Sequence, residues 1–304
     1  MSAHTSNSDI YYVPAPSSWP FLMTVSMTIF MVGFTAWLNG AESGSLIFFA
    51  GLACILAMSF IWLRGVIKES ETGAYNMQVD RTYRWSMGWF IFSEVMFFGA
   101  FFGALYYARQ LSLPWLAGEG SEFATNEYLW NNWEFEWPSN GPSDVGGDYD
   151  AMPPWDLSAG ASMKSFWGSL PLINTLILLT SGVTCTFAHH ALKHEQRVKS
   201  GFWLLATVAL GCTFLGFQAY EYSHAYQEMN LTLGSGIYGS TFFMLTGFHG
   251  AHVTLGTLML FIIMLRCFSG HFTQDRHFGF EGVAWYWHFV DVVWLGLFIF
   301  VYVL

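Results

Sequence analysis

The stretch VAWYWHFVDVVWLGLFIFVYVL, which runs from Val283 to Leu304, decides the class of fold. Apart from His288 and Asp291 it is apolar or aromatic, and a helix needs about 20 such residues to cross the hydrocarbon core of a bilayer. The sequence therefore predicts an all-α membrane protein with seven transmembrane helices, because six similar runs precede this one, at Trp19–Leu38, Ser45–Leu63, Trp85–Tyr107, Leu170–Phe187, Phe202–Tyr222 and Ile237–Leu265.

The overall composition agrees with a membrane protein and excludes other classes. Of the 304 residues, 54% are hydrophobic and only 11% are charged, against about 25% charged residues in a soluble domain. The chain holds 11 Lys and Arg against 21 Asp and Glu, so it lacks the basic excess with which a protein binds nucleic acid. Its four cysteines form no CxxC pair, which argues against a disulfide framework and against a zinc site.

The distribution of basic residues predicts the orientation of the spans. Lys and Arg that flank a span are retained on the cytoplasmic side during insertion. With the N-terminus inside and the C-terminus outside, only Arg109 and Lys164 fall on the outer side. The other basic residues fall on the inner side, at Arg64, Lys68, Arg81, Arg84, Lys193, Arg197, Lys199, Arg266 and Arg276.

The chain then divides into segments by composition. A polar N-terminal segment (1–18) precedes two spans (19–63), an inner loop (64–84), a third span (85–107), an outer loop (108–168) and four further spans (169–304). The outer loop is acidic and rich in Trp, and its Pro and Gly content predicts an irregular excursion rather than a second domain.

Three carboxyl groups fall inside the apolar runs, at Glu94, Glu221 and Asp291. A charge at the centre of a bilayer costs about 2.5–3.5 kcal/mol, so each should face protein, pair with another group or be protonated. Glu94 is either an exchangeable acid in a proton relay or a protonated carboxyl bonded to a neighbouring helix, and the second is favoured. Asp291 follows His288 by three positions, which places both on one helical face and predicts a structural polar pair.

The histidines raise the question of a metal or haem. His249 and His252 lie three apart in the sixth span, and His189 and His190 lie at the inner end of the fourth. A bis-histidine haem needs ligands on facing helices at one depth, and a catalytic metal needs three converging donors. The sequence does not supply such a set, so hydrogen-bonded packing is favoured and no metal ligand is predicted.

Three strings resemble subunit III of haem-copper cytochrome c oxidase. They are YGSTFFMLTGFHGAHV (Tyr238–Val253), FGFEGVAWYWHFVDVVWL (Phe278–Leu295) and SGVTCTFAHHAL (Ser181–Leu192), and Ser93, Glu94 and the WPF opening at Trp19 extend the match. The resemblance covers nearly the whole chain apart from the outer loop, in the family's order.

The resemblance implies a non-redox subunit of a proton-pumping oxidase, a translocase that passes electrons from cytochrome c to oxygen in aerobic respiration. Haem and copper would reside in the partner subunits, and this chain would bind none. It would pack against subunit I in a complex with subunit II, support proton uptake and protect the enzyme during turnover. Spans one and two would form one bundle and spans three to seven another, with phospholipid in a cleft that admits oxygen.

The resemblance also implies roles for particular side chains. Glu94 corresponds to the family's carbodiimide-reactive glutamate. Contacts with lipid headgroups are expected where Arg can bind a phosphate and Trp can lie at the interface, although ordinary anchoring would explain the same residues. The expected lipid-binding residues are Trp62, Arg64, Glu69, Ser70 and Arg266.

Two departures from the family pattern limit these expectations. The family's His-Thr-Pro-Pro turn is replaced here by Tyr75–Val79, which puts part of the lipid site in doubt. The outer loop is longer than in compact mitochondrial forms, which favours a bacterial plasma membrane over the mitochondrial inner membrane. Steering of a basic cytochrome c by its acids is one interpretation, but a solvated cover over neighbouring subunits is favoured.

Other functions remain as alternatives. The chain could be an independent proton-coupled carrier that uses Glu94, Asp291 and the histidines, or a membrane cytochrome with haem on His249 or His252. It could also be subunit III of a quinol oxidase, but that branch usually lacks the first two spans.

Overall fold

The computed structural model describes residues 16–152, 166–274 and 276–304, and over these residues it contains helices and no strand. Seven helices are long and apolar enough to cross a membrane, which confirms the predicted fold class. They are α1 (Trp19–Leu38), α2 (Gly44–Glu71), α3 (Met77–Tyr107), α6 (Phe166–Lys193), α7 (Arg197–Gln227), α8 (Gly236–Phe268) and α9 (Phe278–Leu297).

Several helices are longer than the apolar runs that predict them. α2 continues through Arg64 to Glu71 and α3 begins at Met77, so most of the predicted inner loop is helical. A helix of 28 residues, the length of α2, spans about 42 Å, which exceeds the hydrocarbon core by more than two turns. The charged side chains of α2 end its apolar run, but its backbone hydrogen bonds continue beyond them to Glu71.

The chain divides into two compact units, Met1–Trp85 and Ser86–Leu304. In the first unit, α1 and α2 form a hairpin in which the two backbones touch at glycines. A Cβ added at Gly33 would lie 2.2 Å from the backbone nitrogen of Phe48, and one added at Gly51 would lie 2.4 Å from that of Phe30. Small residues allow transmembrane helices to pack this closely. Most other side chains of the hairpin point outward and are exposed.

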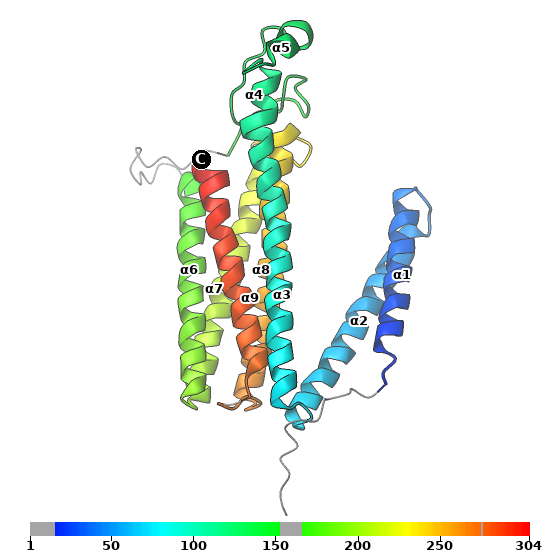
Figure 1. Cartoon of the computed structure of the whole chain (residues 1–304), viewed down its shortest axis with the longest axis vertical. Helices are drawn as coiled ribbons and strands as arrows, with labels where there is room; N and C mark the ends of the chain where they lie inside the picture. The colour runs from blue at the N-terminus through cyan, green and yellow to red at the C-terminus, as the bar shows by residue number, and fades with distance from the viewer. Residues whose placement is uncertain (1–15, 153–165, 275) are drawn as a thin grey trace, which may run out of the picture. The chain divides into compact units, whose positions relative to one another are not determined.

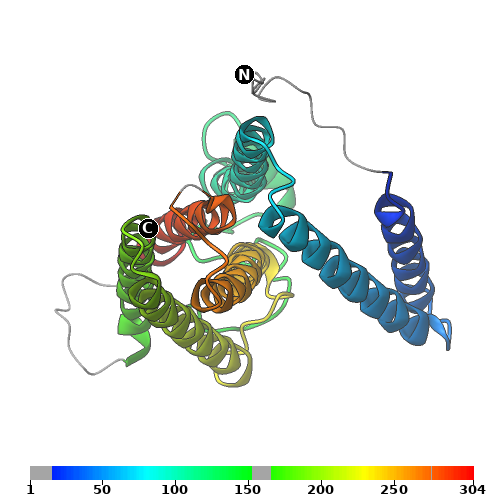
Figure 2. The same ribbon diagram turned by 90° about the horizontal axis from the view of Figure 1, so that it is seen from below.

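The second unit is a bundle in which α3, α6, α7, α8 and α9 run alongside one another (Figure 1). Viewed along the bundle, α9 lies between α3 and α6 (Figure 2). Among the described residues, α9 contains the largest buried side chains, including Trp287 and Trp294. α9 is therefore the helix around which the bundle packs.

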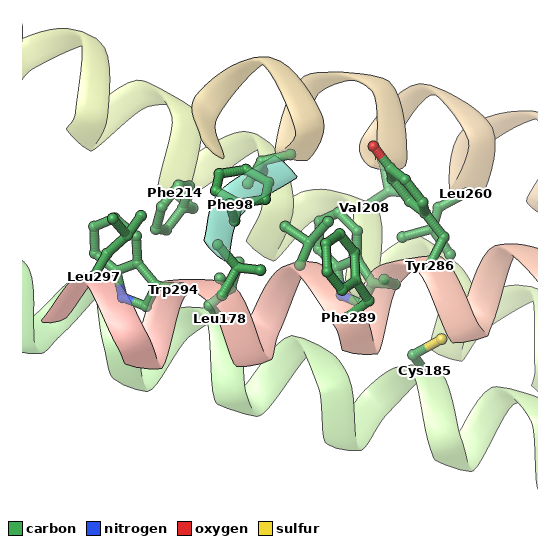
Figure 3. Packing of buried hydrophobic residues seen from close by; sticks show 14 of the residues in the cluster. Phe98, Leu178, Cys185, Val208, Phe214, Leu260, Tyr286, Phe289, Trp294 and Leu297 are labelled. Atoms are coloured by element: carbon green, nitrogen blue, oxygen red, sulfur yellow. The ribbon is translucent and has the colours of Figure 1, made fainter. Parts of the chain in front are cut away.

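Two hydroxyl groups inside this core accept hydrogen bonds from the buried tryptophans. The indole nitrogen of Trp287 donates to Ser181 Oγ at 2.9 Å, and that of Trp294 donates to Thr175 Oγ1 at 2.9 Å. Both hydroxyls belong to α6. Phe214 of α7 packs edge-on against Trp294 at 4.7 Å between ring centroids, as Figure 3 shows. Burial of an indole ring stabilises a fold fully only when its N–H group has a hydrogen-bond acceptor. α6 supplies the acceptor for both tryptophans.

α3 contacts the bundle through aromatic side chains rather than through its backbone. Phe98 is 2% exposed and lies 6.2 Å from the ring of Phe289 on α9, and Phe97 lies edge-on to Phe248 of α8 at 5.0 Å. Rings of this size keep the α3 backbone away from its neighbours while still filling the space between them. The side chains of α3 near Phe98 thus face α8 and α9.

Candidate functional site

A carboxyl and an imidazole from different helices meet within the second unit. Oε2 of Glu94 on α3 lies 3.0 Å from Nε2 of His252 on α8. The other ring nitrogen of His252, Nδ1, lies 2.6 Å from the carbonyl oxygen of Phe248 and must donate to it, because a carbonyl oxygen can only accept. In a neutral His252, Nε2 therefore accepts, and the proton in the 3.0 Å contact comes from the Glu94 carboxyl.

Aromatic rings surround this pair. Phe98 lies 5.0 Å from the His252 ring, and the hydroxyl of Tyr286 donates to the backbone oxygen of His252 at 3.4 Å. The side chains of Glu94 and His252 are 21% and 16% exposed, so one edge of the pair reaches the surface of this unit. The arrangement can hold one proton on either the carboxyl or the imidazole.

Glu221 lies in a separate buried cluster. It is 2% exposed on α7, its Oε1 accepts from the hydroxyl of Tyr302 at 2.9 Å, and its Oε2 accepts from Gln218 Nε2 at 3.2 Å. Tyr302 belongs to the short π-helical turn η3 (Phe298–Val303) at the end of the chain. Both carboxyl oxygens are thus bonded, and the contacts fasten the C-terminal turn to α7.

Asp291 and His288 lie on one side of α9. Their Oδ2 and Nδ1 atoms are 3.7 Å apart, beyond the range of a good hydrogen bond, and His288 Nε2 lies 3.4 Å from Thr186 Oγ1 on α6. Asp291 is 7% exposed. The polar side chains therefore sit at the α6–α9 contact and join two helices.

His249 is enclosed and does not share a partner with His252. Its ring is fully buried, lies 5.1 Å from Trp294 and 5.7 Å from Phe214, and its Nε2 donates to the carbonyl oxygen of Val290 at 3.2 Å. His249 is thus hydrogen-bonded to the α9 backbone and packed against aromatic rings.

The expected lipid-binding residues fall in both units. Trp62, Arg64, Glu69 and Ser70 are exposed on α2, where the hydroxyl of Tyr75 donates to Glu69 Oε2 at 2.7 Å. Arg266 lies near the end of α8 with its guanidinium 4.6 Å from the ring centroid of Phe272. Exposed Trp and Arg at the end of a span suit the headgroup region, as on α2, whereas Arg266 is half-buried.

The outer segment that precedes α6 is fastened to the first turn of α8. It contains the turn η2 (Ala108–Ser112) and the short helices α4 (Leu113–Leu116) and α5 (Phe123–Leu129). Its Tyr149 ring stacks on Tyr238 at 5.9 Å, and the amide of Met152 donates to the Tyr238 hydroxyl at 3.2 Å. Burial, with a further contribution from the charge of Asp144, raises the pKa of the Tyr149 hydroxyl. The predicted irregular loop is therefore packed on its own unit up to residue 152, and residues 153–165 lie outside the described residues.

Sequence reasoning missed one cluster. His189 on α6, His277 before α9 and Glu281 in the first turn of α9 offer three donor atoms within 4.8 Å of one another. His277 and Glu281 are four residues apart, a spacing that places two side chains together at the start of a helix. That spacing was available in the sequence, but the approach of His189 across α6 was not.

Comparisons with known proteins identify the same family as the three sequence stretches quoted above. The family model described as "Cytochrome c oxidase subunit III" matches residues 9–118 and 158–304, which leaves residues 119–157 of the outer loop unmatched. Proteins named "Cytochrome c oxidase subunit 3" from Arabidopsis thaliana and Marchantia polymorpha are 37% and 38% identical over 293 residues, covering 96% of this chain and 95% of each relative. The protein of that name from Hippopotamus amphibius is 36% identical over 299 residues, covering 98% of both chains. The chain therefore belongs to the cytochrome c oxidase subunit III family.

Proposed function

We propose that this chain is the subunit of a proton-pumping oxidase that packs on subunit I, supports proton uptake and prolongs turnover without holding a redox centre. The Glu94–His252 contact carries the proposal, because two groups 3.0 Å apart share one proton and have an exposed edge. Such a pair can take up and release protons within the span, where an isolated carboxylate would be costly. Subunit II and cytochrome c complete the electron path, and haem and copper belong to the partners.

The proposed function also includes binding of phospholipid and a route for oxygen through it. Trp62, Arg64, Glu69, Ser70 and Arg266 bind headgroups, and the acyl chains of the bound phospholipid form the route for oxygen. Exposed large apolar residues on α2, such as Phe60 and Leu63, support lipid contact along this helix.

The membrane that we propose is the bacterial plasma membrane, with the N-terminus inside. The outer loop supports this assignment, because the family model leaves residues 119–157 unmatched although it matches the chain on either side. The three relatives named above come from two plants and an animal, so the assignment depends on the loop and on the distribution of basic residues.

The test compares the intact oxidase complex with a complex from which this chain has been removed. We expect depletion to slow proton uptake and to reduce the number of turnovers before inactivation, while the haem and copper content stays the same. Unchanged uptake and lifetime would contradict the proposal. An independent carrier would instead transport protons when the purified chain alone is placed in vesicles.

A further inference from the structure

The cluster of His189, His277 and Glu281 joins the end of one helix to the beginning of another. His189 lies in the last two turns of α6, His277 precedes α9 directly, and Glu281 lies in its first turn. Oε1 of Glu281 is 3.3 Å from His277 Nε2 and 3.6 Å from His189 Nε2. Two imidazole nitrogens therefore approach one carboxylate oxygen from two different segments.

The backbone fixes how the His277 ring presents itself. Its Nδ1 lies 3.2 Å from the carbonyl oxygen of Thr273 and must donate to it. In the neutral ring, Nε2 then carries a lone pair that faces the Glu281 carboxylate. Within the described residues Nε2 of His277 is buried and makes no hydrogen bond of good geometry. A lone pair beside a carboxylate oxygen is repulsive unless a positive charge lies between them.

We propose that His189, His277 and Glu281 form a binding site for a divalent transition cation of the Zn²⁺ class. Two imidazole nitrogens and a carboxylate oxygen are a common donor set for zinc, with water as the fourth ligand. Zinc–ligand bonds of about 2.0–2.1 Å at tetrahedral angles place the donor atoms about 3.3 Å apart. The His277–Glu281 distance already equals this spacing and the His189–Glu281 distance exceeds it slightly.

The surroundings suit such an ion. The second nitrogen of a metal-bound histidine usually donates to a carbonyl or carboxylate, as His277 does to Thr273. The ring of His189 stacks on the buried Phe280 with centroids 5.4 Å apart, which holds its orientation. The His189 side chain is 23% exposed and that of His277 only 8%, so an ion can enter from the side of His189.

The bound ion would fasten the last turns of α6 to the start of α9, the helix around which the bundle packs. Imidazole ligands favour Zn²⁺, Cu²⁺ or Ni²⁺ over Mg²⁺ and Ca²⁺, which prefer oxygen. The competing occupant is a proton, which would turn His277 into an imidazolium paired with Glu281. Only the metal gives a stoichiometric uptake of zinc that depends on all three residues.

The experiment measures zinc in the purified oxidase complex that contains this chain. The complex is stripped with chelator, equilibrated with micromolar Zn²⁺ and excess Mg²⁺, and analysed by mass spectrometry of the metal. We expect Glu281→Gln and His277→Gln each to hold one zinc fewer per chain than the wild type. Equal zinc content in wild type and Glu281→Gln would overturn the proposal and leave the protonated pair as the occupant.

His190→Gln is the matched control. His190 is exposed next to His189 in sequence, and its ring lies 4.5 Å from that of His194, so this pair could take up zinc from its surface position. We expect His190→Gln to retain the zinc ion that Glu281→Gln loses. If only His190→Gln loses zinc, the ion binds at His190 and His194 and the proposal is contradicted. Subunit composition and the haem spectrum check assembly, and His189→Gln replaces any variant that does not assemble.

A second readout uses stability. A ligand that binds only the folded state stabilises it in proportion to the logarithm of its concentration above Kd. Zn²⁺ should therefore raise the temperature at which the wild-type complex releases this chain, but not that of Glu281→Gln. Equal shifts in both complexes would show that zinc acts elsewhere.

Discussion

Gly182 on α6 leaves the space that the carboxyl group of Asp291 on α9 occupies. A Cβ built at position 182 would lie 2.5 Å from Oδ2 of Asp291 and 3.4 Å from Nδ1 of His288. The buried acid can therefore approach the α6 backbone only because residue 182 has no side chain, and the polar contact between these helices depends on a hydrogen atom in that position.

Replacing this glycine tests the relationship. We expect Gly182→Ala to destabilise the bundle by about 1–3 kcal/mol, because the new methyl group overpacks a closed contact. The measurement is the denaturation midpoint of the detergent-solubilised complex, followed as loss of this chain. Gly216→Ala is the control on α7, since a Cβ there meets no atom within 4 Å. The double variant Gly182→Ala/Asp291→Ala should lose less than the sum of the single variants; strict additivity would contradict the contact.

Removing the acceptor for Tyr302 should loosen the end of the chain. Glu221→Leu leaves the hydroxyl of Tyr302 and the amide of Gln218 without their acceptor, and each buried unpaired group costs about 1–3 kcal/mol. Glu221→Gln keeps an oxygen and should cost less. Hydrogen exchange of the amides in η3 reports the effect directly. Equal protection in Glu221→Leu and wild type would show that this carboxyl does not hold the C-terminal turn.

The pairing of Glu94 with His252 predicts an effect on carboxyl reactivity. A protonated carboxyl transfers its proton to a carbodiimide nitrogen, and the carboxylate oxygen then adds to the central carbon to form an O-acylisourea. His252 competes for that proton. We expect His252→Ala to remove the competing proton acceptor and to increase the labelling of Glu94 by a hydrophobic carbodiimide severalfold, measured by peptide mass spectrometry. His288→Ala is the control, because His288 contacts Asp291 instead. Slower labelling in His252→Ala than in the control would mean that the imidazole does not take the proton.

Glu94→Gln tests whether the pair is obligatory for turnover. The amide keeps the shape of the carboxyl and can still bond to His252, so we expect assembly and substantial oxidase activity. The variant should lose lifetime during turnover more than initial rate. Complete loss of turnover in an assembled variant would instead indicate an obligatory proton step at Glu94.

The exposed acids of the outer loop allow a test of steering. Glu119, Glu127, Glu134 and Glu136 are all exposed, and replacing the four with Gln removes charge while the Tyr149–Tyr238 anchor stays. We expect the salt dependence of kcat/KM with cytochrome c to stay unchanged, because a cover over neighbouring subunits is the favoured role. A flatter salt dependence, absent with an uncharged electron donor, would favour steering.

The sequence predicted the spans because hydrophobic runs of bilayer length leave little alternative. It could not give the true helix ends, since α3 begins at Met77, eight residues before the run that starts at Trp85. It placed His288 and Asp291 on one face from their spacing, which is local. The partners across helices, such as His252 for Glu94 and His189 for Glu281, depend on how the helices rotate and pack, and a single sequence does not record this.

The glycines of the α1–α2 hairpin have an evolutionary consequence. The seam between these helices is made by their own main chains at Gly33 and Gly51, and the buried cluster of the larger unit is built only from residues that follow Trp85. A gene could therefore acquire or discard the hairpin as a whole cassette. Neither event would remove a residue from that buried cluster.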